Sequence, residues 1–345
     1  MSDTLIIKGV AICFMLWHHL FYTFSEYGDW VQNAAFLGKV CIAMFLFVSA
    51  YGLTIQYGKI EIHKFQAPRF SDTLKFQGKR FLKLYINYWV IFLLFVPIGV
   101  FFFHRSLQVA YGAQINQLKY LITDLLGMNG FQSYNITWWF YQVIIILYLI
   151  FPILYIAVKK LNIFILLLFF LILVYHDFII PIVHLWLFPF ALGISSALNK
   201  EKITSFLNRT DWKILFVCNL ILLCSVAYLK LDEWLFGGLG MDGFFTVTLI
   251  FLIITTLRKV KIVTQVLQFL GKHSMNIFMI HTFIFYYFYS GFIYSFKYPA
   301  LIFIVLLASS LCVSILIEYC KKMIGIYRLE NKIIDLYLLT NPPKP

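Results

Sequence analysis

Three ionisable side chains, Lys8, His18 and His19, interrupt the first apolar stretch of the sequence. Burying such a group in a bilayer is costly, so each is a candidate functional residue that faces the interior of a helix bundle. Lys8 and His19 are eleven residues apart, which in an α-helix places them about 20° apart on one face and roughly 16 Å apart along the axis. One face therefore carries a cation near the cytoplasm and, far up the helix, a histidine suited to general base catalysis at neutral pH.

A carboxylate follows this pair. Glu26 lies seven residues beyond His19 and shares its face if the helix continues that far. It would then orient the imidazole and stabilise its protonated form. An alternative stays open, in which Lys8 extends to the lipid headgroups and both histidines lie at a wet interface. Glu26 is then a loop residue.

The composition indicates that a membrane surrounds these residues. Of 345 residues, 62% are hydrophobic, 20% are aromatic and 12% are charged, and the mean hydropathy is +0.85. A soluble domain carries about a quarter charged residues, so a water-exposed globular protein is excluded. Disordered, collagen-like and secreted disulfide-rich classes are excluded by the same figures. Within lipid, apolar runs of this length and pattern must be helices.

Windows of about 20 residues, enough to cross the hydrocarbon core, predict an all-α polytopic membrane protein with about ten transmembrane helices. We expect a single integral-membrane domain over residues 1–330 and a cytoplasmic tail at 331–345. The first run lacks a basic n-region and a small-residue cleavage site, so it is not expected to be a cleavable signal peptide. The predicted spans are 4–24, 36–56, 86–103, 138–158, 161–175, 178–198, 212–229, 243–257, 274–292 and 299–320.

The distribution of charge predicts the orientation. With the N-terminus inside, 23 Lys and Arg side chains fall on the inner side of the membrane and five on the outer side. This obeys the positive-inside rule and predicts that both termini are cytoplasmic. The net charge of +13 then mostly reflects the excess of Lys and Arg on the inner side of the membrane. No nucleic-acid partner is therefore expected. The six cysteines lie in or beside apolar runs without zinc-ligand spacing, so no metal site is expected.

Two segments between the spans are distinctive. Residues 57–85 form a basic cytoplasmic connection that places Lys79, Arg80 and Lys83 within about one helical turn before the third span. Residues 104–137 form the longest outer loop, which is rich in Gln, Asn, Tyr and Gly and nearly uncharged. Uncharged hydrogen-bonding and aromatic side chains suit a sugar better than an ion.

Five short segments carry a further signal in their order along the chain. They are IIKGVAICFMLWHH at 6–19, FLFVSAYGLT at 45–54, KRFLKLYINYW at 79–89, WWFYQVIIILYLIFPIL at 138–154 and LGKHSMNIFMIHTFI at 270–284. They resemble motifs of the membrane-bound acyltransferase-3 family, whose first helix is marked by an arginine, ten residues and a histidine. Lys8 and His19 meet that pattern with lysine in place of arginine. Ala50 stands where glycine is usual, and Lys83 replaces a second arginine.

The resemblance implies transfer of a short acyl group, commonly acetyl from cytoplasmic acetyl-CoA, to a hydroxyl of a cell-surface or cell-envelope carbohydrate. Acetyl-CoA is then a co-substrate, and the protein lies in the bacterial cytoplasmic membrane with the lipid bilayer and the carbohydrate acceptor as partners. His19 is expected to act as the general base or to carry the acyl group as an acyl-imidazole, and His18 is the second candidate for the base. The donor's phosphates are expected at Lys8, Lys79, Arg80 and Lys83. The phosphopantetheine arm, roughly 15–20 Å long, would run along the first helix.

Further candidates have two interpretations each. Ser274 is either an N-cap or part of the donor channel. His281 is expected to hydrogen-bond in the tunnel wall rather than to take part directly in the chemistry. Trp138 and Trp139 are either interfacial belt residues or a platform that stacks on the acceptor sugar.

In the second motif, Ser49 and Tyr51 are expected to hydrogen-bond near the first helix and to contact substrate. Two rival functions stay open, a transporter or flippase for a lipid-linked glycan and a glycan polymerase. Neither requires the spacing of Lys8 and His19 on one helix face, nor a basic cytoplasmic cluster.

Overall fold

The computed structural model describes residues 2–64, 69–113, 116–174, 183–233, 238–257 and 260–339. Within these ranges the secondary structure is helical throughout, with no strand, so the predicted all-α membrane fold is confirmed. Residues 175 and 178–182 of the fifth and sixth predicted spans, and residues 340–345 of the predicted tail, lie outside the described residues.

The chain divides into two compact units, each built from two separate stretches of sequence. Unit 1 comprises Met1–Lys59 and Ile150–Ser274, and unit 2 comprises Ile60–Leu149 and Met275–Pro345. The boundaries fall within the helices α3, α7 and α13, which are continuous across them.

Unit 1 contains most of α3 together with helices from the first and middle parts of the chain. Its helices are α1 (Ser2–Phe21), α2 (Asp29–Gly38), α3 (Cys41–Lys64), the end of α7 (Trp139–Leu161), α8 (Ile163–Val174), α9 (His184–Leu198), α10 (Lys200–Arg209), α11 (Trp212–Leu231), α12 (Asp242–Thr255) and the start of α13 (Lys261–Thr282).

Unit 2 contains the long helix α4 and the C-terminal helices. Its elements are α4 (Phe70–Phe102), α5 (Leu107–Tyr111), α6 (Gln117–Leu125), the start of α7, the end of α13, a π-helical segment (Phe283–Phe288), α14 (Ser290–Tyr294), α15 (Pro299–Ile324) and α16 (Ile326–Leu339).

Six helical stretches are long and apolar enough to cross a membrane, and three shorter apolar helices accompany them. The total of ten spans and the cytoplasmic placement of both termini stay predictions. The six stretches are Asp3–Phe21, Asp29–Ile60, Phe70–Phe102, Ile136–Leu161, Trp212–Leu231 and Pro299–Ile324. The three shorter helices are Ile163–Leu173, His184–Leu198 and Leu239–Thr255.

Three helices begin or end at other residues than the predicted spans, whose limits in the membrane stay predictions. The first helix ends at Phe21 rather than at residue 24, and the third predicted span is part of a helix that already begins at Phe70. The ninth predicted span is 274–292, whereas α13 runs from Lys261 to Thr282. Lys, Arg and Gln lower hydropathy but are good helix formers, so basic helical turns before a span are invisible to a hydropathy window.

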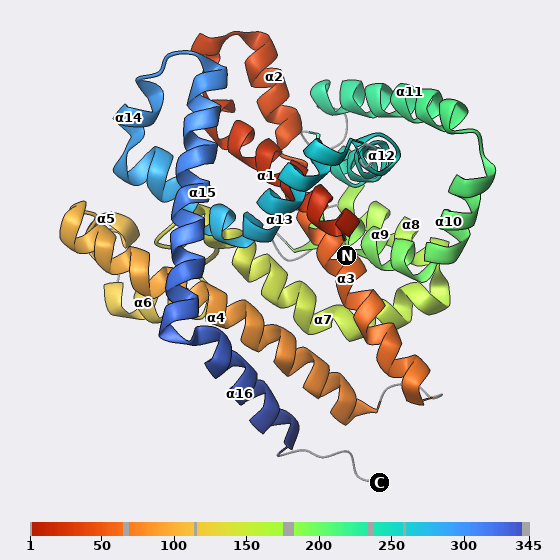
Figure 1. Cartoon of the computed structure of the whole chain (residues 1–345), viewed down its shortest axis with the longest axis horizontal. Helices are drawn as coiled ribbons and strands as arrows, with labels where there is room; N and C mark the ends of the chain where they lie inside the picture. The colour runs from red at the N-terminus through yellow and green to blue at the C-terminus, as the bar shows by residue number, and fades with distance from the viewer. Residues whose placement is uncertain are drawn as a thin grey trace. The chain divides into compact units, whose positions relative to one another are not determined.

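Glycines allow α1 to pack closely on two neighbours in unit 1. A Cβ atom at Gly9 would lie 2.2 Å from the Leu267 carbonyl oxygen of α13, and one at Gly271 would lie 2.0 Å from that of Leu5. On the other side of α1, a Cβ atom at Gly38 of α2 would lie 2.7 Å from the Phe14 carbonyl oxygen. Small residues thus bring helix backbones together, as is common in membrane proteins. Figure 1 shows α1 and α2 side by side.

The predicted outer loop of unit 2 is organised around one buried carboxylate. Asp124 is 0% exposed and accepts hydrogen bonds from the Tyr111 hydroxyl at 2.9 Å and the Tyr134 amide at 2.5 Å. Tyr88 of α4 also donates to its side chain, at 3.3 Å. Burial raises the Asp124 pKa to about 6, although these donors act in the opposite direction. The loop is therefore a folded structure attached to α4.

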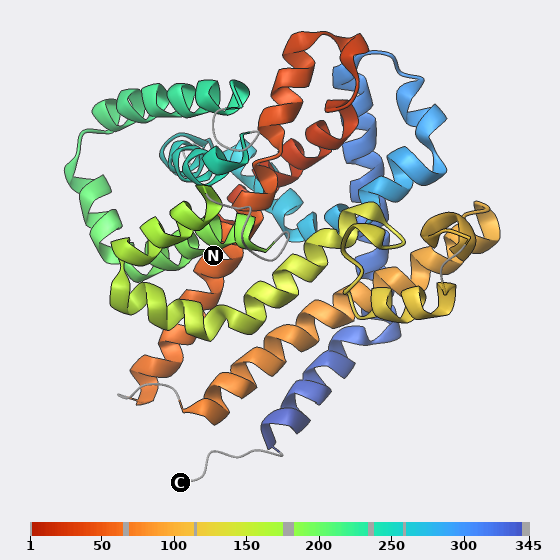
Figure 2. The ribbon, with the colours of Figure 1, turned by 180° about the vertical axis from the view of Figure 1, so that it is seen from behind.

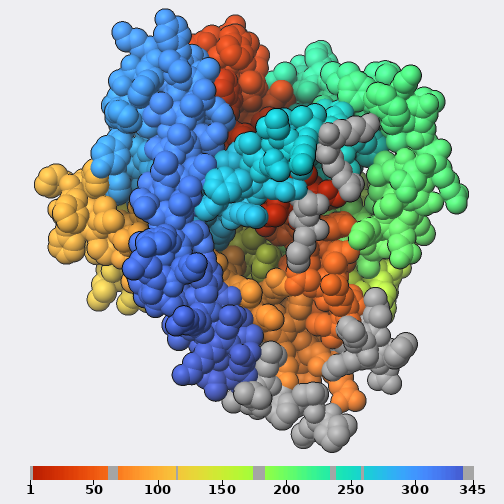
Figure 3. Space-filling view, in the orientation of Figure 1, coloured from red at the N-terminus to blue at the C-terminus, as the bar shows by residue number. Residues whose placement is uncertain are grey.

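The C-terminal part of unit 2 turns back at a glycine. Gly325 caps α15 in the left-handed conformation, with φ of 80°, and α16 follows directly. Residues 331–339 of the predicted tail are thus helical. Figure 2 shows α16 running beside α4, and in Figure 3 α15 and α16 are in view in blue along much of their length.

Candidate functional site

The helix α1 carries Lys8, His18 and His19 without a break, because all three fall within Ser2–Phe21. The helical spacing on which the sequence argument depends is therefore confirmed, and Lys8 and His19 lie roughly 16 Å apart along the axis. Lys8 and both histidines are half-buried. The helix thus presents two imidazoles, at successive positions of its C-terminal end, on a partly accessible surface.

The ring of His18 is oriented by the neighbouring helix. Its Nδ1 atom lies 2.7 Å from the Ala35 carbonyl oxygen of α2. A carbonyl oxygen only accepts, so Nδ1 carries the proton and Nε2 keeps its lone pair in the neutral ring. The His18 and His19 ring centroids are 5.1 Å apart, edge to face. The Ala35 contact therefore fixes one tautomer beside the predicted catalytic histidine.

Glu26 does not continue the face of His19. The helix ends at Phe21, and Glu26 is exposed in a short 3-10 turn, Ser25–Tyr27. The condition under which Glu26 was expected to orient the imidazole is therefore not met. A glycine at position 28 with φ of 91° follows this turn and starts α2, so the chain reverses here instead of extending the helix.

Ser274 lies in the middle of α13 and is 5% exposed, so its interpretation as an N-cap is wrong. The contacts of Gly9 with Leu267 and of Gly271 with Leu5 show that α1 and α13 run in opposite directions where they touch. Since Ser274 follows Gly271 by about one turn, it lies toward the N-terminal, Lys8-bearing end of α1. Its predicted role at the donor channel stays a prediction.

Ser49 and Tyr51 lie on α3 and are half-buried. Between them, Ala50 is fully buried and packs against α9, where a Cβ atom at Gly193 would lie 2.9 Å from the Ala50 Cβ atom. The residue that departs from the family motif is thus at a close helix contact. The predicted substrate contacts of Ser49 and Tyr51 stay predictions.

Unit 1 also contains a buried ion pair that the sequence argument did not single out. Lys230 at the end of α11 is 0% exposed and lies 2.5 Å from Asp242 Oδ1 at the start of α12. Its ammonium is also 5.0 Å from the centre of the Phe36 ring of α2. These two residues are twelve positions apart across a helix break, a spacing that gives no periodic signal in the sequence.

The predicted phosphate-binding cluster lies on α4, in unit 2. Lys79 is exposed, whereas Arg80 and Lys83 are half-buried. The Arg80 guanidinium lies over the Phe76 ring at 5.3 Å, and Lys83 forms an ion pair with Glu330 of α16 at 3.2 Å. Three cations thus occur within about a turn of one helix, and one of them has a carboxylate partner.

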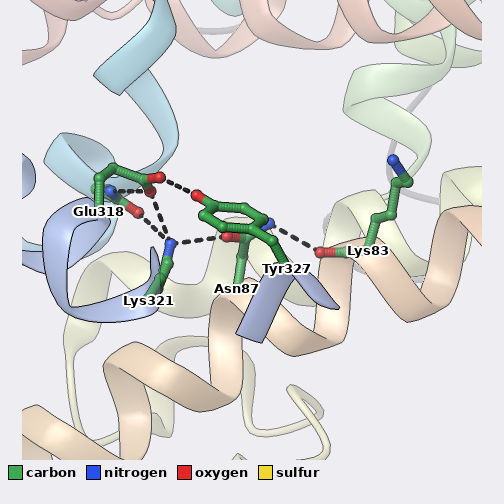
Figure 4. A network of polar contacts seen from close by, with 6 residues as sticks. Lys83, Asn87, Glu318, Lys321 and Tyr327 are labelled. Carbon is green, nitrogen blue, oxygen red and sulfur yellow. Dashed lines mark hydrogen bonds and ion pairs between the residues drawn. The ribbon is translucent and has the colours of Figure 1, made fainter. Parts of the chain in front are cut away.

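A polar network lies beside this cluster (Figure 4). The ammonium of Lys321, which is 1% exposed, donates to Asn87 Oδ1 at 2.8 Å, to Asn276 Oδ1 at 3.1 Å and to Glu318 Oε1 at 2.9 Å. Glu318 also accepts from Asn276 at 2.7 Å and from the Tyr327 hydroxyl. Burial and Glu318 together raise the pKa of Tyr327, which keeps its proton at neutral pH.

This network connects four helices of unit 2 around the basic cluster. Asn87 belongs to α4 and donates its amide to the Lys83 carbonyl oxygen at 2.9 Å. Asn276 belongs to α13, Glu318 and Lys321 to α15 and Tyr327 to α16. Two of the partners of Lys321, Asn87 and Asn276, lie 234 and 45 positions away in the sequence, so no local pattern reveals them.

Trp138 is unavailable for stacking on a sugar, so this prediction is wrong. It is 1% exposed, and its ring is surrounded by those of Tyr88 at 5.2 Å and Phe92 at 5.7 Å. Its indole nitrogen donates to the Met279 carbonyl oxygen at 3.0 Å. Trp139 is half-buried, with its ring 5.2 Å from that of Phe131, and its contact with the acceptor stays a prediction.

His281 is fully buried in α13. Its Nδ1 atom lies 2.8 Å from the Phe278 carbonyl oxygen, and its Nε2 atom lies 3.3 Å from the Thr282 hydroxyl. Thr282 is in turn 3.0 Å from the hydroxyl of Thr137. His281 is therefore hydrogen-bonded within the protein, and its place in a substrate tunnel stays a prediction.

The two groups of candidate residues belong to different units. The first group lies in unit 1 and provides imidazoles, and the second lies in unit 2 and provides cations; their joint action on one donor stays a prediction. Across the described ranges, no three His, Cys, Asp or Glu side chains come together as ligands of a metal ion would.

Comparison with known proteins gives one family. A family model described as an acyltransferase domain, Acyl_transf_3, matches residues 6–319. The matched stretch includes every candidate residue on α1, α3, α4, α7 and α13. No curated protein and no solved structure matches the chain.

Proposed function

The chain belongs to the acyltransferase-3 family and is a membrane acyltransferase, and on that premise we propose that it carries an acetyl group from cytoplasmic acetyl-CoA to a hydroxyl of a cell-envelope carbohydrate. The observation that carries the proposal is α1, which holds Lys8 and His19 on one uninterrupted helix. The length between them suits a donor bound by its phosphates at one end and reacting at the other. The bacterial cytoplasmic membrane is its proposed location.

The proposed reaction is general base catalysis. A sugar hydroxyl is too weak an acid to attack a thioester unaided at neutral pH, so His19 accepts its proton as the oxygen attacks the thioester carbonyl carbon. The C–O ester bond forms and the C–S bond breaks. The imidazolium then returns the proton to the departing thiolate, which gives the acetylated sugar and CoA thiol.

An acyl-imidazole on His19 is the alternative within the same chemistry. His19 then attacks the thioester itself, CoA leaves as the thiol, and the acceptor hydroxyl takes the acetyl group in a second step. The oriented ring of His18, with Nδ1 bound to Ala35 at 2.7 Å, supports its place as the next candidate for the base.

The donor's phosphates are proposed to bind the basic cluster of α4. Lys79 and Arg80 have no carboxylate partner among the described residues, whereas Lys83 is paired with Glu330. Multiple cations in one helical turn suit a polyanion. Lys8 and Lys83 stand where the family motifs have arginine. Lysine keeps the positive charge but lacks the guanidinium group, which can bind a phosphate through two parallel hydrogen bonds.

Binding of labelled acetyl-CoA to the purified protein tests the donor. The wild type is expected to bind it and to release or transfer its acetyl group. Replacing Lys79, Arg80 and Lys83 with glutamine is expected to raise the Kd about tenfold or more, because the phosphates lose three cations. The matched control replaces three exposed cations of α10, Lys200, Lys202 and Arg209, and is expected to leave the Kd unchanged.

An equal change in both triple variants would mean that the α4 cations contribute only general charge. No binding and no acetyl release by the wild type would contradict the acetyl-CoA proposal. A transporter or flippase for a lipid-linked glycan would then be the better account, since it also uses many spans and intramembrane cations.

A further inference from the structure

The helix α10 (Lys200–Arg209) contributes no buried residue to unit 1. It connects the apolar helix α9, which ends at Leu198, to α11, a candidate membrane span that begins at Trp212. Figures 1 and 2 both show α10 as the connection between these helices, at the edge of unit 1. Because an apolar helix adjoins α10 on either side, both ends of α10 are held at the level where those helices end.

One face of α10 is apolar and exposed. Ile203, Phe206 and Leu207 recur at the helical spacing of three and four residues, and Ile203 and Phe206 are 39% and 57% exposed. Trp212, at the start of α11, is 56% exposed, and tryptophan is enriched where a membrane meets water. An exposed apolar face beside a candidate span suits the acyl chains at the surface of a bilayer.

Cations flank this apolar face on both sides. At about 100° per residue, Lys200 lies roughly 60° to one side of Ile203, and Lys202 and Arg209 lie roughly 100° and 120° to the other side. All three cations are exposed, and none has a carboxylate partner among the described residues. Long basic side chains in such positions reach lipid headgroups while the apolar face stays among the acyl chains.

The polar face of α10 carries a shallow, open groove of about 490 Å³. Lys200 and Arg209 line its opposite edges, since nine residues in a helix correspond to a rotation of about 180°. Hydroxyl and amide side chains lie between these two cations and can hydrogen-bond to a polyol. Cations at the edges suit a phosphate. The full lining is Lys200, Glu201, Thr204, Ser205, Asn208 and Arg209.

We propose that α10 and the first turn of α11 form a lipid-binding surface that prefers anionic phospholipids. The apolar face enters the acyl region, and Lys200, Lys202 and Arg209 bind headgroup phosphates. Residues 200–213 carry four Lys or Arg and two Asp or Glu, a net charge of +2. The charge distribution of the sequence predicts that they lie on the cytoplasmic side, where anionic lipids attract basic segments. Lipid binding here requires no acetyl transfer, so it is independent of the proposed function.

Photo-crosslinking of the full-length protein in phosphatidylcholine nanodiscs tests the surface. The nanodiscs contain equal small amounts of either phosphatidylglycerol or phosphatidylcholine with a diazirine in one acyl chain, and mass spectrometry identifies the labelled peptides. The phosphatidylglycerol probe is expected to label Ile203–Leu207 about fivefold more than the phosphatidylcholine probe, because only the former has a net negative charge. Val217 and Ile221, exposed in the middle of α11, are the internal reference that both probes label equally.

Two variants separate the charge from the apolar face. Lys202→Gln/Arg209→Gln is expected to reduce the fivefold preference to about twofold or less. Its matched control, Lys119→Gln/Lys297→Gln, removes the same charge from two exposed positions of unit 2 and is expected to keep the preference. Phe206→Ser is expected to leave the melting temperature in detergent unchanged, since the residue is 57% exposed, but to lower labelling of α10 by both probes about threefold.

Three outcomes would overturn the proposal. If neither probe labels α10 while both label α11, the apolar face of α10 lies in water. If both probes label α10 equally, or if Lys202→Gln/Arg209→Gln keeps the preference, the cations do not recognise anionic headgroups. If the two double variants lose the preference equally, general charge rather than α10 attracts the lipid. All labelling is measured without acetyl-CoA, so failure of the proposed acetyl transfer would leave these results unchanged.

Discussion

The two buried lysines of this protein are partnered in opposite ways. Lys321 in unit 2 uses its three donors on Asn87, Asn276 and Glu318, and no donor remains. Lys230 in unit 1 has one carboxylate partner, whose second oxygen is buried and unpaired. Both lysine side chains are at most 1% exposed, so burial alone does not distinguish them.

The difference separates a structural site from a site with remaining capacity. A saturated network fixes helices and has nothing left for a ligand, which assigns Lys321 the role of holding α4, α13 and α15 around the basic cluster. A pair with an unused acceptor is costly unless something binds it. The predictions below test this contrast, beginning with the largest expected effect.

Lys230→Met is expected to destabilise the protein by about 3 to 5 kcal/mol, because it leaves the Asp242 charge buried without compensation. Thermal unfolding of the purified protein in detergent measures this. The double variant Lys230→Met/Asp242→Leu is expected to recover most of the stability, since apolar residues can replace a buried pair. A double variant as unstable as the single one would show that the pair is not the dominant interaction there.

Asp124 extends the comparison to a buried carboxylate satisfied by neutral donors. Its pKa is raised to about 6 by burial, so its contribution to stability is full below pH about 4 and is lost as the pH rises through 6. Asp124→Asn is expected to remove about 3 kcal/mol of this pH dependence. Unfolding at pH 4 and pH 7 for both proteins measures it; equal pH profiles would contradict an ionisable, buried Asp124.

Lys321→Met is expected to cost about 2 to 3 kcal/mol, because it leaves the oxygens of Asn87 and Asn276 without their charged donor. Lys322→Met is the matched control, since Lys322 is the next residue and is exposed. Melting temperatures of the two variants give the comparison. If both shift equally, the network around Lys321 does not hold the helices of unit 2 together.

Glu330→Gln is expected to give the smallest effect on stability, less than about 1 kcal/mol, because the Lys83 side chain is 45% exposed in the ion pair. Removing the competing carboxylate is expected to tighten acetyl-CoA binding about twofold. Asp335→Asn, exposed on the same helix, is the control. Weaker binding by Glu330→Gln alone would mean that Glu330 positions Lys83 for the donor.

The sequence predicts the helical fold and the spacing on α1 because both depend on local patterns. Apolar runs of span length identify the membrane helices, and Lys8 and His19 share a face through helical periodicity alone. The order of five short motifs along the chain indicated the family as well. The starts of α4 and α13 lie before the predicted spans because their basic turns are helical without being apolar.

The contacts of the buried polar and aromatic side chains could not be predicted from the sequence. Lys321 meets Asn87 across 234 positions of sequence, and no window contains both. Trp138 looked like an interfacial aromatic, but packing against Tyr88 and Phe92 encloses it. Glu26 failed as a partner of His19 because a turn, not a helix, follows Phe21.

The most direct test of the account is the mass of the envelope glycan in strains that carry His19→Ala, His104→Ala or the wild type as the sole copy. His104 is exposed in the predicted outer loop and serves as the control. The account predicts that the glycan of the His19→Ala strain lacks the mass of one acetyl group per acetylated sugar, at a normal protein level in the membrane, whereas the His104→Ala strain matches the wild type. A fully acetylated glycan in the His19→Ala strain would contradict the role of α1 in the transfer.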